Sequence, residues 1–184
     1  MPRRAGCRGG PREKQEMGVK SRGPRKTFNK ILERVILAAP ALVGASRMDE
    51  PIRTMTDVII SSGRERSLRR QHPWLLSGAV ASEPGEAHAG AWVRVVSKGG
   101  EVLGYGHYSP KSSIRVRLLA FGKEDPGEQL LEQRLEAALA RRREHPLLRE
   151  TDAMRLVNAE GDGLPGLVVD RLGDVVVLKF LTAG

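Results

Sequence analysis

Short runs of alternating apolar and polar residues dominate the chain after Met55. The clearest run is 114–121, where Ile114, Val116 and Leu118 alternate with arginines, as expected for a strand with one buried face. The predicted strands are the short apolar run 58–60, the extended stretches 77–82 and 101–108, and the alternating runs 92–97 and 114–121. Several short strands separated by turns are typical of a small barrel or sandwich.

Two of the connecting segments carry their own signals. The polar stretch 63–70 predicts a short helix or turn, which ends before Pro73 because the residue preceding a proline disfavours helix. Gly99-Gly100 predicts a two-residue hairpin between the third and fourth of these strands.

A helix is predicted after the last of these strands. Asp125 is placed to cap it, Pro126 suits its first position, and Glu128 lies three residues after the cap. An apolar stripe at helical spacing consists of Leu131, Leu135, Ala138 and Leu139. His145-Pro146 closes the helix.

The last part of the chain returns to strands. We expect one strand at 154–158, a turn at 162–166, and a pair formed by 167–170 and 175–181 across 171–174. A strand as apolar as 175–181 needs a neighbour on its edge, so this second unit looks incomplete. The predicted class is α+β: a small β-barrel, then a helix and an incomplete β-hairpin domain.

Residues 1–54 differ from the rest in composition and predict a basic, disordered leader. They hold 13 Lys+Arg against 5 Asp+Glu, a net charge of +8, whereas residues 55–184 have 18 against 17, a net charge of +1. The overall charge of +9 is therefore weak evidence that the folded part binds a polyanion. We interpret Met55 or Met48 as a possible true start of the protein.

The composition also limits the chemistry. The single cysteine, Cys7, lies in the leader, so we predict neither a disulfide nor a zinc cluster, and the four histidines lack metal-ligand spacing. The longest apolar run, 35–45, is about half the length needed to cross a bilayer. We therefore expect no membrane segment, no bound metal and a cytoplasmic location.

Clustered arginines are the main candidates for a binding surface. Arg64, Arg66, Arg69 and Arg70 place four guanidinium groups in seven residues, which suits RNA phosphates; the alternative is a solvated polar helix, with Glu65 offsetting part of the charge. The candidates that extend this surface are Lys111, Arg115 and Arg117, whose alternative is an ordinary exposed strand face.

Other conspicuous residues are interpreted as structural. Trp74 can stack on a base, but its neighbours favour a core position, and His72 is taken as structural. The run 141–143 is interpreted as solvation of a helix end. Glycines 99, 100, 104 and 106 are assigned to turns and bulges, because a dinucleotide loop follows a strand and opens a helix.

Three blocks of the sequence resemble one family. Residues 72–80 (HPWLLSGAV), then 104–110 (GYGHYSP) with 114–117 (IRVR), and finally 161–171 (GDGLPGLVVDR) occur here in the family's order. They resemble the first part of the PUA-domain-containing, S-adenosylmethionine-dependent 23S ribosomal RNA cytosine-5 methyltransferases. The resemblance covers about 57–184 and has no counterpart for the leader.

The resemblance implies a PUA-like RNA-binding domain at 55–123 and a linking helix with the start of a central α+β domain at 124–184. The methyltransferase domain, its S-adenosylmethionine site and its nucleophilic cysteine have no match in this chain, so no catalytic or cofactor-binding residue is assigned. Ribosomal RNA is the implied partner, and the oligomeric state stays open. The alternatives are a free-standing β-barrel adaptor and a PUA domain of another RNA-modifying enzyme, such as a pseudouridine synthase.

Overall fold

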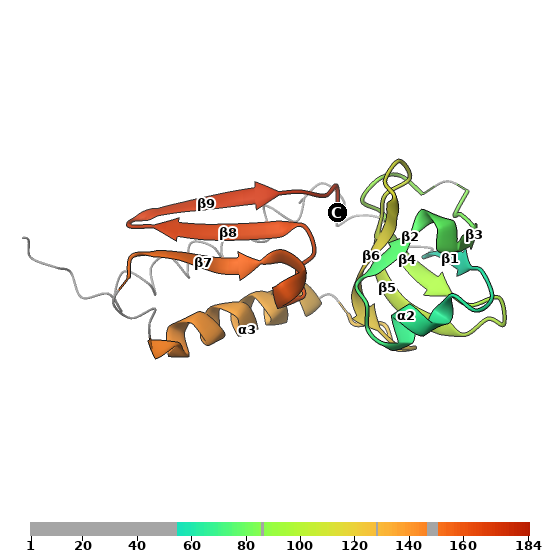
Figure 1. Cartoon of the computed structure of the whole chain (residues 1–184), viewed down its shortest axis with the longest axis horizontal. Coiled ribbons are helices and arrows are strands. Elements are labelled where there is room, and N and C mark those ends of the chain that lie inside the picture. Colours follow the sequence, from blue (N-terminus) through green and yellow to red (C-terminus); the bar gives the residue numbers. More distant parts are fainter. Residues whose placement is uncertain (1–54, 86, 128, 147–150) are drawn as a thin grey trace, which may run out of the picture.

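The computed structural model describes residues 55–184 apart from 86, 128 and 147–150. The described part contains a six-stranded sheet with a short helix, followed by a long helix and a three-stranded sheet (Figure 1). The predictions about the leader, including its disorder and Cys7, lie outside the described residues.

Strands of the first sheet follow the order β2-β6-β5-β4-β1-β3. Only the β1–β4 pair is parallel; the others are antiparallel. The elements are β1 (Thr56–Ile60), α2 (Glu65–Arg69), β2 (Trp74–Leu76), the 3₁₀ turn η2 (Ser77–Ala79), β3 (Val80–Ser82), β4 (Trp92–Val96), β5 (Val102–Tyr108) and β6 (Ile114–Phe121).

The first sheet curls because its two edges are consecutive in the sequence. The edge strands β2 and β3 are separated only by the three residues of η2, so the opposite ends of the strand order must come together. Backbone hydrogen bonds hold this joint on both sides: the Ser77 amide donates to the Ser113 carbonyl and the Ser61 amide to the Ala79 carbonyl, each at 2.8 Å. The predicted small β-rich barrel is thus observed as a curled half-barrel.

The inward-facing side chains of the strands fill the interior of the curled sheet. Val93 and Val95 of β4, like Val58 and Ile60 of β1, are fully buried, while the residues between them face outward. Leu68 joins this core from α2 and is 2% exposed. The period-two pattern therefore predicted the inward residues Val93 and Val95 of β4 correctly.

Two glycines of β5 allow a close approach to β6. A Cβ at Gly104 would overlap with the Ala120 carbonyl, and one at Gly106 would overlap with the Arg117 carbonyl. The register shifts between Tyr105 and Gly106, which marks a bulge at this point. These glycines have the structural role that the sequence indicated.

Some local predictions were wrong. Residues 77–82 do not form one extended stretch, since η2 turns the chain between the two sheet edges. The β4–β5 hairpin has a three-residue loop, because the Ser97 amide donates to the Glu101 carbonyl and the Gly100 amide to Ser97. Gly100 adopts φ +84° there, the left-handed conformation that a bulge after a type I turn requires.

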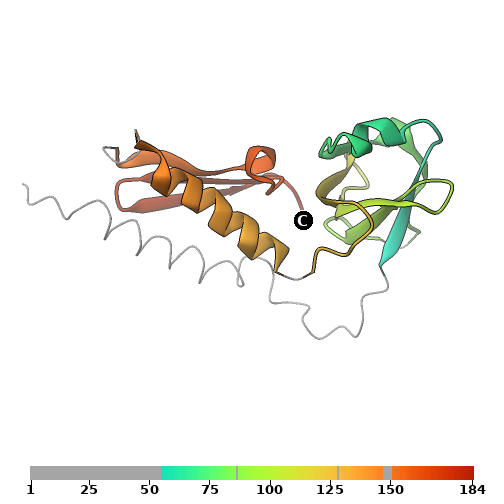
Figure 2. The same cartoon turned by 90° about the horizontal axis from the view of Figure 1, so that it is seen from below.

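The second sheet packs on one long helix (Figure 2). Its elements are α3 (Leu130–Glu144), β7 (Ala153–Asn158), the 3₁₀ turn η4 (Ala159–Asp162), β8 (Leu167–Leu172) and β9 (Val175–Phe180). The strands are antiparallel in the order β7-β8-β9, and the predicted stripe of α3 faces the core that they form. The turn between the last two strands is Gly173-Asp174, shorter than predicted.

Asp125 does not cap α3. Its carboxylate instead accepts a hydrogen bond from the Gly127 amide at 2.9 Å, and Gly127 has φ +74°. A left-handed residue cannot continue a right-handed helix, so α3 begins only at Leu130, after Gln129.

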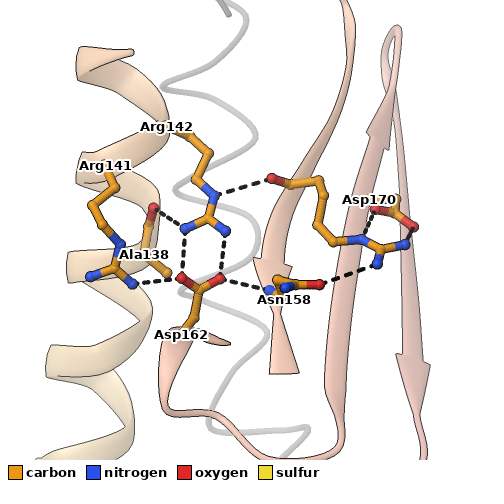
Figure 3. A network of polar contacts seen from close by, with 7 residues as sticks. Ala138, Arg141, Arg142, Asn158, Asp162 and Asp170 are labelled. Carbon is orange, nitrogen blue, oxygen red and sulfur yellow. Dashed lines mark hydrogen bonds and ion pairs between the residues drawn. The ribbon is translucent and has the colours of Figure 1, made fainter. Parts of the chain in front are cut away.

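A buried carboxylate holds α3 to the second sheet (Figure 3). The Asp162 side chain is 4% exposed and accepts two hydrogen bonds from Arg142 at 2.7 and 2.6 Å and one from Arg141 at 2.6 Å. The Asn158 amide donates a fourth at 2.7 Å. The interpretation of 141–143 as solvated cations was therefore wrong for Arg141 and Arg142, because their partner comes from a turn about twenty residues away.

These donors set the ionisation of Asp162. Burial disfavours its charge, but the hydrogen bonds from the two arginines and from the Asn158 amide outweigh burial and hold the pKa of the carboxyl below its usual value. The charged form is thus the stable form in the folded protein, although the Asp162 side chain is almost fully buried.

No helix within the described residues is long and apolar enough to span a membrane.

We expect Gly106→Ala to lower the free energy of unfolding by about 1–3 kcal/mol, because its Cβ would force β5 away from the β6 backbone. Gly99→Ala is the matched control: its nearest neighbour would be the Ser97 Oγ at 3.7 Å, so the change should be below about 0.5 kcal/mol. Urea unfolding of both variants measures the difference, and equal stabilities would contradict the close approach.

Asp162→Asn should destabilise the fold by about 3 kcal/mol, because it leaves the guanidinium groups of Arg141 and Arg142 without their charged partner. Asp170→Asn, which breaks the more exposed pair with Arg155, should cost less than about 1 kcal/mol. Because the folded-state pKa of Asp162 is depressed, its contribution is present above about pH 4 and is lost as the pH falls below that value. Thermal unfolding between pH 2 and 7 tests this, and a wild-type minus Asn difference that stays constant with pH would contradict it.

Candidate nucleic-acid interface

A hollow of about 540 Å³ lies where the two edges of the first sheet meet. Four segments line it: Arg64 and Ser67 from α2 and its start, residues 72 and 74–76 around β2, the η2 turn, and Ser113 just before β6. The hollow thus depends on the curl of the sheet, which brings these segments together.

Trp74 is not a core residue, contrary to the sequence interpretation. In the three-residue strand β2 the central Leu75 is buried at 1% exposure, so its neighbours Trp74 and Leu76 face outward and are 40% and 53% exposed. The Trp74 indole Nε1 donates to the Glu160 carboxylate at 3.0 Å, which joins the first sheet to η4. The His72 ring meets the indole edge-on, with centroids 5.8 Å apart.

The four arginines around α2 diverge. Arg64 lines the hollow, and Arg69 forms a two-pronged ion pair with Glu101 in the β4–β5 hairpin. Arg66 and Arg70 each lie two positions from the buried Leu68, so they are on nearly the opposite side of the helix and are exposed. The structure therefore places one of the four at the hollow and binds one to an acidic side chain, while two face solvent.

Lys111 and Arg117 lie near the hollow on other elements. Lys111 is exposed and two residues from Ser113, which lines the hollow. Arg117 of β6 is the cross-strand neighbour of Trp74 and is half-buried. Both candidates come from segments distant from α2 in sequence.

Arg115 is engaged within the protein. Its Nε lies 2.9 Å from a Glu83 carboxylate oxygen, an ion pair without the geometry of a hydrogen bond, and its side chain is 15% exposed. The Tyr108 hydroxyl donates to the same carboxylate. Burial and this carboxylate raise the pKa of Tyr108 above its ordinary value. Glu83 and Tyr108, which the sequence did not single out, thus decide the surroundings of Arg115.

The described residues do not fit a metal or a nucleotide cofactor. No group of three or more His, Cys, Asp or Glu side chains within them is arranged to hold a metal ion. Gly104 and Gly106 lie inside β5 against β6, not in a loop that opens a helix. What this surface offers is an exposed indole, serine side chains and a guanidinium group.

Comparison with known proteins identifies the first sheet. Residues 58–121 match the PUA-like domain family. The chain therefore contains a PUA-like domain. The PUA-like fold that the sequence resemblance implied is confirmed for these residues.

Curated relatives extend the similarity beyond this domain. The ribosomal RNA large subunit methyltransferase I of Alteromonas mediterranea is 42% identical over 128 residues, covering 69% of this chain and 32% of the relative. The protein of the same name from Escherichia coli is 40% identical over 131 residues, with the same coverage. This chain is homologous to these proteins and spans about a third of their length.

Solved structures agree on the fold. A candidate SAM-dependent methyltransferase from Streptococcus mutans superposes with a TM-score of 0.57 at 20% identity, over 70% of this chain and 34% of that protein. A second, described as a methyltransferase complexed with SAH, gives a TM-score of 0.59 at 22% identity, over 70% and 33%. At these identities the likeness concerns the fold.

Proposed function

We propose that this chain is the RNA-binding part of a SAM-dependent 23S rRNA cytosine-5 methyltransferase and contributes recognition of the rRNA. In this proposal residues 55–123 are the RNA-binding domain, and 124–184 link it to a methyltransferase domain. That domain would bind S-adenosylmethionine and provide the nucleophilic cysteine. The observation that carries the proposal is the hollow of the PUA-like domain, whose lining residues include Arg64 and the exposed Trp74 but no Asp or Glu. The place of action is the cytoplasm, where the ribosome is made.

Partners within the protein separate the candidate cations into two groups. Arg69 and Arg115 are neutralised by Glu101 and Glu83. The side chains that have neither an ion pair nor a hydrogen bond within the described part of the chain are Arg64, Arg66, Arg70, Lys111 and Arg117. An unneutralised cation on a surface attracts phosphate and releases counterions when it binds, which is the main source of affinity for RNA.

The shape of the surface favours structured RNA. Arg64 lines the hollow, whereas the other candidate cations lie on separate segments, at α2, in the loop before β6 and in β6, and do not line a single groove. Such a surface contacts the backbone at several points and recognises the shape of a folded RNA more than its sequence.

The affinity for structured fragments of 23S rRNA should fall with salt, with a slope of log K against log[salt] near −3 if about four cations contact phosphates. Replacing Arg64, Arg66 and Arg70 with Gln should weaken binding at least tenfold and reduce the slope by about 2. The control removes the same charge from the second unit by Arg143→Gln, Arg155→Gln and Lys179→Gln, and should leave the slope unchanged. Fluorescence anisotropy at several salt concentrations measures both.

A salt-independent interaction, or a partner protein that stays bound after nuclease treatment while RNA does not bind, would contradict the proposal and favour the adaptor.

The 184 residues alone should transfer no methyl group to RNA. Cytosine-5 methylation needs a positioned thiolate, and the only cysteine of the chain is Cys7 in the basic leader. A radiolabelled methyl-donor assay with rRNA fragments is the measurement. Turnover above the protein-free blank would contradict the proposal that catalysis needs a separate methyltransferase domain.

A further inference from the structure

We infer that the hollow beside Trp74 binds one unpaired nucleobase of the RNA, stacked on the indole ring. The inference rests on the proposed function and adds to it the kind of RNA that is bound: a stem that carries an extruded or bulged nucleotide. Phosphate contacts alone would not distinguish such an RNA from a perfect duplex.

The indole of Trp74 is held in place. Its Nε1–H is already bonded to Glu160, and His72 contacts the ring edge-on, so the ring is oriented from two sides before any ligand arrives. Because the only polar atom of the indole is used, what Trp74 still offers is its exposed aromatic surface. A fixed and exposed aromatic ring is the usual platform for an unpaired base.

The walls of the hollow suit a flat, partly polar ring. Leu76, next to the indole on the same outer face of β2, is 53% exposed and supplies an apolar contact. Ser67, Ser77 and Ser113 come from three different segments. The Ser67 hydroxyl donates to the Arg64 carbonyl at 3.4 Å and can still accept a hydrogen bond, while the hydroxyl groups of Ser77 and Ser113 can donate to or accept from the edge of a base. A paired base hides this edge inside the helix, so only an unpaired nucleotide can reach these groups.

The charge of the hollow favours a nucleotide over a neutral ligand. Arg64 is one of its lining residues and has no acidic partner among the described residues, and no Asp or Glu is among those lining residues. A base stacked on Trp74 would therefore bring its own phosphate towards a guanidinium group.

The test uses the full chain and two RNA hairpins that differ only in one bulged adenosine. The wild-type protein should bind the bulged hairpin about tenfold more tightly, and Trp74→Ala should remove this preference while it leaves binding of the paired hairpin within about twofold. Glu160→Ala keeps the ring but removes one of the two contacts that orient it, so it should reduce the preference without abolishing it.

A second measurement does not depend on the folding of the Ala variant. In Trp92→Phe, Trp74 is the only tryptophan, and its emission should be quenched by the bulged hairpin and not by the paired one. Equal affinity for both hairpins, with the salt slope intact, would overturn the inference and leave the proposed function standing. A preference that persists in Trp74→Ala would overturn it too, and binding of neither hairpin would overturn both proposals.

Discussion

Closure of the first sheet at η2 is the constraint on which the rest depends. Only three residues separate the edge strands β2 and β3, so the sheet must curl until its two edges meet. The close approach of β5 to β6 at Gly106 accommodates this curvature. The curl has two sides. Its inside excludes water and buries the valines and leucines of five strands, and where its edges meet it leaves a hollow beside Trp74. Stability and the candidate binding surface thus come from one geometric requirement.

Acidic partners determine which cations remain for a ligand. Glu101 and Glu83 neutralise Arg69 and Arg115, although both glutamates are distant in sequence from the arginines that they bind. A body with nearly balanced charge can therefore still present a local positive surface, since pairing removes some charges and leaves others. The proposed RNA binding depends on the local excess of cations that have no acidic partner, and not on the charge of the basic leader.

Trp74 lines the hollow and also connects the two sheets through its hydrogen bond to Glu160. Its bond to Glu160 connects the half-barrel to η4, and η4 ends at Asp162, the carboxylate to which two arginines of α3 are bonded. A chain of polar contacts thus runs from the hollow to the long helix. It is consistent with a recognition domain whose orientation relative to the following part of the protein is defined.

The sequence by itself determined most of the elements. Period-two alternation identified the inward residues of β4 and β6, the spacing of leucines identified the buried side of α3, and two of the three ordered blocks lie in the PUA-like domain. These features are local, so neighbouring residues contain the information. Only the tertiary structure decided that Trp74 faces outward, that Arg142 binds Asp162, and that segments from four elements form one hollow. Each of these depends on a partner brought near by folding, and no local pattern specifies which distant residue that partner is.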